Sequence, residues 1–129
     1  MEPNATDKVP SSLRFWFVVH FVVDIVFALP LLLIPEWLMP LLGWRYVDPI
    51  SSRLVGAALM GIGGASLLER KASAEVFRAM LNLKIIWATG SVVGIGLGLL
   101  HGGPPASWAL LAIFAAFLAL WIHYRLQMR

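Results

Sequence analysis

Four long apolar stretches, separated by short segments with charges, prolines or glycines, account for most of the chain. A helix needs about 20 apolar residues to cross a bilayer, and each stretch is close to that length. The pattern predicts spans at about 13–34, 50–68, 77–100 and 106–124. We therefore expect an all-α fold, an integral membrane four-helix transmembrane bundle.

The chain before the first span is polar and contains Pro3 and Pro10, which is typical of a loose tail. We expect residues 1–12 to form a flexible cytoplasmic tail and residues 13–129 to form a single four-span membrane domain. A cleavable signal peptide is the alternative interpretation of the first span. No small-residue cleavage site follows that span and Asp24 lies inside it, which favours a permanent membrane helix.

The segment between the first two spans, residues 35–48, is apolar but interrupted by prolines and by Gly43. It is too short to span, and it carries aromatic rings of the kind that prefer the headgroup layer: Trp37, Trp44 and Tyr46. We expect a short interfacial segment after the first helix, with one short helix before Gly43. Asp48 and Pro49 then indicate a helix start, because an acidic residue caps free amides and proline suits the first helical position.

The composition supports a membrane environment. Of the 129 residues, 60% are hydrophobic and 13% are charged, and the mean hydropathy is +0.82. Soluble domains have about 25% charged residues. The formal net charge is +3, but the basic residues form no run with interleaved aromatic side chains, so we exclude nucleic acid as a partner. Cysteine is absent, which excludes disulfides, thiolate metal sites and cysteine nucleophiles.

Basic residues flank the predicted spans unevenly. The side that holds both chain ends and the middle loop carries most of them: Lys8, Arg14, Arg70, Lys71, Arg78, Arg125 and Arg129. The opposite side carries Arg45 and Arg53. Because loops rich in lysine and arginine stay in the cytoplasm, we expect a multi-pass protein with N- and C-termini cytoplasmic.

Small residues recur at every fourth position in two neighbouring spans. They share one helix face, where they allow a second backbone to come close. Because the two spans are consecutive and antiparallel, we expect a close-packed seam between two faces, Ala57, Gly61 and Ala65 on one and Gly90, Gly94 and Gly98 on the other. The alternative is that the glycine face makes a contact between copies of the chain. The GIGGAS run at 61–66 lacks the Lys-Ser/Thr ending of a phosphate loop, and we interpret it as packing.

Four polar residues inside the predicted spans form a candidate intramembrane polar cluster: His20 and Asp24 on the first span, Asn82 and Lys84 on the third. Asp24 is ten residues beyond Arg14, which at about 1.5 Å per residue places it about 15 Å deep. His20 is one turn away on the same face. A charge at the bilayer centre costs about 2.5–3.5 kcal/mol, so we expect these groups to face protein or a water-filled cavity.

Three interpretations of this cluster stay open. In the first it is structural, with Asp24 bonded to a neighbouring helix and Lys84 paired with it or extending to the cytoplasmic surface. In the second it binds a proton or a small solute, and in the third His20 and Asp24 act as an acid–base pair. His101 and His123 are expected at opposite ends of the bundle, so we expect no metal site. No catalytic motif is present, and we assign no catalytic residue and no cofactor.

Two stretches carry a family resemblance. One is PEWLMPLLGW at 35–44, and the other is SRLVGAALMGIGGASLLER at 52–70. Through them, roughly the first half of the chain resembles small four-helix bacterial membrane proteins of the DoxX-like kind. Those proteins are largely uncharacterised, and some are linked to quinone or redox complexes. The resemblance implies a four-helix bundle in the bacterial inner membrane and assigns no catalytic residue.

These features predict a small polytopic membrane protein whose favoured role is non-enzymatic, as an accessory or assembly subunit. The first alternative is an oligomeric proton- or small-solute transporter or channel that uses Asp24 and Lys84. The second is a quinone- or lipid-linked membrane enzyme. The expected partners are the lipid bilayer and either further copies of the chain, in a homo-oligomer, or a larger membrane complex.

Overall fold

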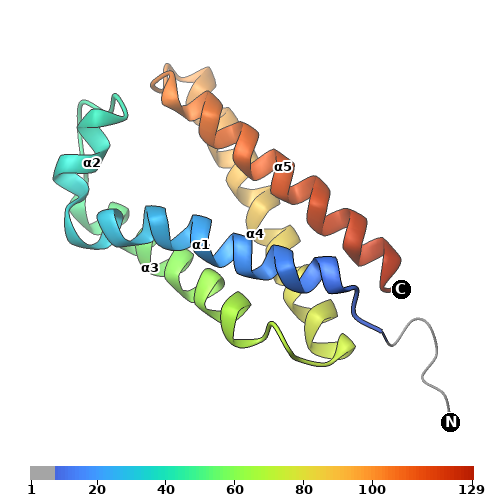
Figure 1. Ribbon diagram of the computed structural model, residues 1–129. Coiled ribbons are helices and arrows are strands. Elements are labelled where there is room, and N and C mark those ends of the chain that lie inside the picture. Colours follow the sequence, from blue (N-terminus) through green and yellow to red (C-terminus); the bar gives the residue numbers. More distant parts are fainter. Residues whose placement is uncertain (1–7) are drawn as a thin grey trace, which may run out of the picture. The chain divides into compact units, whose positions relative to one another are not determined.

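The computed structural model describes residues 8–129, which contain helices and connecting turns but no strand (Figure 1). The helices in order are α1 (Ser11–Leu33), α2 (Pro35–Leu41), α3 (Pro49–Leu68), α4 (Ala74–Leu100) and α5 (Ala106–Gln127). All except α2 are long and apolar enough to cross a membrane. The predicted all-α fold and the four spans are therefore confirmed.

The observed helix ends differ from the predicted spans by a few residues. α1 includes Ser11 and Ser12, which were predicted to belong to the tail, and the first seven residues of that tail lie outside the described residues. α4 begins at Ala74, with Ser73 at the N-cap position, although the Ser73 side chain makes no capping hydrogen bond. α5 continues one turn beyond its predicted end to Gln127. Polar residues therefore extend the helices beyond the apolar stretches.

The chain divides into two compact units, which we describe separately. The α1–α3 unit comprises residues 14–71 and so contains α1 from its fourth residue onward. The α4–α5 unit comprises residues 72–129 together with the described residues up to Leu13. The predicted cluster and the predicted seam each have members in both units.

In the α1–α3 unit, α1 and α3 run side by side in opposite directions (Figure 1). At one end Nη1 of Arg14 donates to the main-chain carbonyl of Arg70, at 2.9 Å. At the other end Nε of Arg53 donates to the carbonyl of Leu32, at 3.0 Å. Each arginine comes from the start of one helix and bonds to a carbonyl near the C-terminal end of the other, where the helix dipole favours a cation.

Between these two arginine contacts, glycines bring α3 close to α1. A Cβ on Gly63 would stand 2.7 Å from Cβ of Asp24, and one on Gly56 would stand 3.0 Å from the carbonyl oxygen of Ala28. Only a residue without a side chain fits at Gly63. The packing interpretation of the GIGGAS run is thus confirmed at this position, whereas a Cβ on Gly61 would meet no atom of the unit within 4 Å.

The connection between α1 and α3 is the short helix α2 followed by a tight turn. Gly43, with φ of 94°, adopts a left-handed conformation that glycine tolerates, and the amide of Trp44 bonds back to the carbonyl of Met39. The predicted short helix before Gly43 is therefore confirmed. Trp37 and Tyr46 are exposed in this connection. Their placement agrees with, but does not test, the predicted interfacial position.

In the α4–α5 unit, the two long helices form an antiparallel hairpin. The turn between them contains Gly102, with φ of 82°, and the amide of Gly103 bonds to the carbonyl of Gly98 at 2.9 Å. Aromatic rings line the contact between the helices: Trp87 of α4 meets Phe114 of α5 edge-on, with the ring centroids 6.3 Å apart. Large aromatic side chains therefore lie at the contact between these two helices.

Candidate functional site

His20 and Asp24 form one half of the predicted polar cluster. They lie one turn apart on α1, and Nδ1 of His20 is 3.2 Å from Oδ2 of Asp24, so the two form an ion pair when the imidazole is protonated. Each residue is only 5% exposed. An acid and an imidazole in contact inside an apolar span are a combination able to hold a proton.

The backbone of α3 fixes the position of the Asp24 carboxylate. Gly63 faces it so closely that Oδ2 of Asp24 would lie 3.0 Å from a Cβ added to Gly63. Asp24 is thus enclosed between its own helix, with His20 one turn away, and the glycine of the neighbouring helix. The same contact that packs the two helices therefore also limits the room around the carboxylate.

Lys84 is part of the other half of the predicted cluster and interacts with an aromatic ring of its own unit. Its Nζ lies 5.0 Å from the centroid of the Trp121 ring on α5, and both residues are only 1% exposed. Trp121 in turn stacks on Phe117, with the centroids 5.5 Å apart and the planes at 17°. A cation over the face of tryptophan is stabilised by about 2 kcal/mol when both groups are desolvated.

Asn82 also has a partner on α5. Its Oδ1 accepts a hydrogen bond from Nε of Arg125, at 2.8 Å. Close to this bond in sequence, the hydroxyl of Tyr124 donates to Oγ of Ser12, also at 2.8 Å. Asn82 and Lys84 thus link α4 to α5, and His20 and Asp24 pair on α1. The assembly of all four residues into one cluster stays a prediction.

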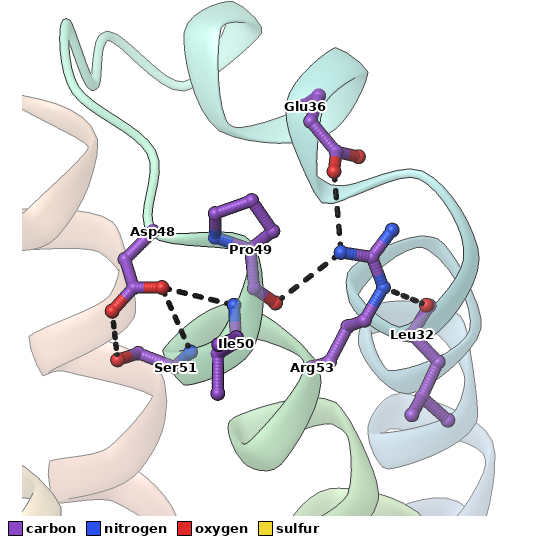
Figure 2. Close-up of polar contacts among 7 residues, drawn as sticks. All are labelled: Leu32, Glu36, Asp48, Pro49, Ile50, Ser51 and Arg53. Atoms are coloured by element: carbon purple, nitrogen blue, oxygen red, sulfur yellow. Dashed lines mark hydrogen bonds and ion pairs between the residues drawn. The ribbon is translucent and has the colours of Figure 1, made fainter.

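Arg53 is the centre of a polar network at the α2 end of the α1–α3 unit (Figure 2). Besides the carbonyl of Leu32, its guanidinium contacts Oε1 of Glu36 at 3.2 Å and the carbonyl of Pro49 at 3.4 Å. These three acceptors belong to the end of α1, the start of α2 and the start of α3. One arginine thus joins all three helices of the unit.

The cap of α3 is drawn beside the contacts of Arg53 (Figure 2). Oδ1 of Asp48 accepts from the amides of Ile50 at 2.9 Å and Ser51 at 3.4 Å, and Oδ2 accepts from the Ser51 hydroxyl at 2.6 Å. These bonds lower the pKa of Asp48, first through the Ser51 hydroxyl and then through the two amides. The predicted helix start at Asp48 and Pro49 is confirmed.

Glu36 is also outside the spans, and its pKa is lowered. The largest cause is a hydrogen bond from its own backbone amide, followed among the lowering causes by the bond and charge of Arg53. The side chains of Glu36 and Arg53 are both about half exposed. Because water screens the two charges, their ion pair contributes little to the free energy of unfolding. The contacts of Arg53 thus fix the start of α2 against the end of α1 and the start of α3.

The glycine face of α4 is open within its unit. A Cβ added to Gly90, Gly94 or Gly98 would meet no atom of the α4–α5 unit within 4 Å, so α5 packs on other positions of α4. The seam with Ala57, Gly61 and Ala65 concerns both units and stays a prediction. Among residues 8–129, no three His, Cys, Asp or Glu side chains are grouped so that they could hold a metal ion.

Sequence reasoning missed the partners of Lys84 and Asn82. A tryptophan near the end of a span, such as Trp121, is typical of the membrane interface, and Arg125 was counted only as a flanking charge. Both lie on the face of α5 that meets α4. Their spacing of four residues, one helical turn, was the available signal that they share a face.

No protein-family model matches the chain, and no curated protein and no solved structure matches it.

Proposed function

We propose that the protein is a non-enzymatic accessory or assembly subunit of a membrane complex. The supporting observation is the use of polar side chains inside the spans. His20 and Asp24 pair with each other against Gly63, and Lys84 lies over Trp121. The contacts of Asp24 with Gly63 and of Lys84 with Trp121 join neighbouring helices. They involve residues from which a reactive centre would be built. This favours a structural interpretation of the polar cluster.

The open glycine face of α4 is the surface on which we expect a partner to dock. Helices in lipid associate by close packing of small residues, and Gly90, Gly94 and Gly98 leave such room within their unit. The partner is either a second copy of the chain or another membrane protein. The alternative, in which α3 covers this face, makes a different prediction for the same variants.

Replacing Gly94 by leucine tests this role. We expect Gly94→Leu to lose its partner during purification in mild detergent, measured by size-exclusion chromatography with light scattering, without a change in thermal midpoint. Gly96→Leu is the matched control, because Gly96 is equally open within the unit but points away from that face. A wild-type chain that purifies as a stable monomer without any other protein would contradict the proposal. A lower thermal midpoint in Gly94→Leu alone would assign the face to the seam with α3.

The location proposed with this role is the bacterial inner membrane, with both termini in the cytoplasm. The resemblance to DoxX-like proteins supports the first part, and the distribution of lysine and arginine supports the second. Because the chain has no cysteine, single cysteines can report the topology directly. An impermeant thiol reagent added to intact cells should label Arg45→Cys but not Lys8→Cys or Arg129→Cys. Labelling of Lys8→Cys and Arg129→Cys would contradict the proposal and place both termini outside the cytoplasm.

A second candidate function is movement of a proton or small solute across the membrane. One observation favours it specifically. Nδ1 of His20 is 3.2 Å from Oδ2 of Asp24, and both of these α1 residues are buried. Four spans rarely enclose a pathway alone, so this role requires an oligomer. In proteoliposomes, Asp24→Asn should abolish proton flux, whereas Glu36→Gln, which removes an exposed carboxylate of the same unit, should leave it unchanged. Equal flux in the wild type and Asp24→Asn would exclude this role.

A further inference from the structure

The end of the α1–α3 unit where α1 begins and α3 ends carries an excess of positive charge. Arg14, Arg70 and Lys71 contribute three positive charges there and Glu69 contributes one negative charge, so the sum is 3 − 1 = +2. At the opposite end of the unit Arg53 is paired with Glu36. The two ends are thus built on similar arginine-to-carbonyl contacts but differ in charge.

Hydrogen bonds tie two of these cations to main-chain carbonyls near the end of α3. Nη1 of Arg14 donates to the carbonyl of Arg70, and Nη1 of Arg70 donates to the carbonyl of Leu67, at 2.6 Å. Both side chains are half-buried, so they are ordered while still reaching solvent. A guanidinium has five N–H donors in a planar fork. Phosphate oxygens are the acceptors that match such a fork.

Large apolar side chains next to these cations are exposed. Phe15 follows Arg14 and is 61% exposed, and Leu68 precedes Glu69 and is 77% exposed. Both belong to helices that are long and apolar enough to span a membrane. Cations at the end of an apolar helix pair, bordered by exposed apolar side chains, match a molecule that has an anionic head and a hydrocarbon tail.

We infer that Arg14, Arg70 and Lys71 form a binding site for the phosphate headgroup of an anionic phospholipid, with Phe15 and Leu68 against its acyl chains. Basic clusters at the ends of membrane helices attract anionic headgroups by about 1 kcal/mol per cation, which corresponds to about fivefold in affinity for each. The two guanidiniums supply the fork and Lys71, which is exposed, supplies the third charge. All residues of the site belong to the α1–α3 unit. The inference does not depend on the proposed accessory role.

Lipid titration of the detergent-solubilised chain tests the site. Native mass spectrometry should show that the wild type retains phosphatidylglycerol more strongly than phosphatidylcholine. Lys71→Gln and Arg70→Gln should each weaken the retention of phosphatidylglycerol by about fivefold. Arg45→Gln is the matched control: it removes one exposed positive charge from the same unit, outside the cluster, and should bind lipid as the wild type does.

Three outcomes would overturn the inference. The first is equal retention of phosphatidylglycerol and phosphatidylcholine by the wild type. The second is an equal loss in Arg45→Gln and Lys71→Gln, which would assign the effect to net charge alone. The third is retention of inorganic phosphate as strong as that of phosphatidylglycerol in the same measurement, which would make this a site for a free anion. Lys71→Gln keeps the test valid if Arg70→Gln fails to fold, because Lys71 forms no bond of the arginine contact.

Discussion

The two helix pairs of this protein are held together by different kinds of contact. α1 and α3 approach through Gly56 and Gly63 and are joined at each end by an arginine that donates to a carbonyl. α4 and α5 contact each other through the Trp87 and Phe114 rings and through Lys84 over Trp121. α4 nevertheless has four glycines, at positions 90, 94, 96 and 98, which lie in open space within the unit.

This difference teaches that a glycine in a membrane helix has no fixed role. Gly63 is required because the backbone of α3 comes within contact distance of Asp24, whereas the glycines of α4 leave a surface uncovered by α5. Glycine therefore has two roles here. In the α1–α3 unit it lets two helices of the unit pack closely, and in the α4–α5 unit it leaves a helix face free to pack against something outside the unit. Substituting glycines one at a time separates these two roles.

The largest effect is expected at Gly63. Gly63→Ala places a Cβ 2.7 Å from Cβ of Asp24, and neither atom is at the end of a flexible side chain, so a helix must shift. Overpacking of this kind costs about 1–3 kcal/mol. Unfolding in detergent micelles should show this loss of free energy. It should be absent in the neighbouring variant Gly64→Ala, because a Cβ on Gly64 meets no atom within 4 Å. Equal free energies of unfolding in the two variants would show that α3 does not pack closely against Asp24 at Gly63.

The second prediction concerns the contact by which the α4–α5 unit differs from the α1–α3 unit. A double-mutant cycle with Lys84→Met and Trp121→Leu should give a coupling free energy of about 0.5–2 kcal/mol, the range for a cation over an aromatic face. The control cycle pairs Lys84→Met with Trp108→Leu, because Trp108 is an exposed tryptophan of the same helix. We expect no coupling there. Additive effects in both cycles would show that Lys84 is stabilised by something other than Trp121.

The fold could be predicted to a large extent from the sequence because lipid imposes a simple length rule. Twenty or so apolar residues make a span, and interruptions such as Asp48-Pro49 mark where one begins. The structure places that helix start at the same two residues, with the Asp48 carboxylate as the cap. The limits of α4 and α5 were less accurate, because Glu75 in the first turn of α4 and Arg125 and Gln127 in the last turn of α5 interrupt the apolar pattern.

The partners within the site could not be predicted in the same way. Helical spacing tells which residues share a face, and it correctly paired His20 with Asp24 on one helix. It does not tell which face meets a neighbouring helix. Trp108 and Trp121 illustrate this: both lie near an end of α5, but only Trp121 is buried, because it is on the side that meets Lys84.

The third prediction concerns the open face of α4, where the effect should have the opposite sign from that at Gly63. Gly94→Ala adds a methyl group where the unit has space, and alanine favours a helix over glycine by about 0.5–1 kcal/mol. The free energy of unfolding of the isolated chain should therefore stay the same or rise by up to that amount. A loss as large as that of Gly63→Ala would show that this face is packed within the chain, as in the predicted seam with α3.

The smallest effect is expected where α3 and α4 begin, and it depends on pH. The Ser51 hydroxyl and the amides of Ile50 and Ser51 lower the pKa of Asp48 below its ordinary value of 3.8. The stabilisation by the ionised carboxylate is therefore complete above pH 3.8 and is lost as the pH falls through the lower pKa of the folded state. Asp48→Asn keeps a capping side chain without the charge. The difference in thermal midpoint between the wild type and this variant should thus decrease toward zero with acidification below pH 3.8.

Ser73→Ala supplies the comparison at the start of α4. Ser73 has the N-cap position but its side chain makes no capping hydrogen bond, so its removal should change the thermal midpoint little at any pH. If the gap between the wild type and Asp48→Asn stayed constant through acidification, the charge on Asp48 would not contribute to the cap. A large loss in Ser73→Ala would mean that both spans begin with a working side-chain cap. The contrast between the two units would then be confined to their interiors, where glycines pack α3 against α1 and aromatic rings pack α4 against α5.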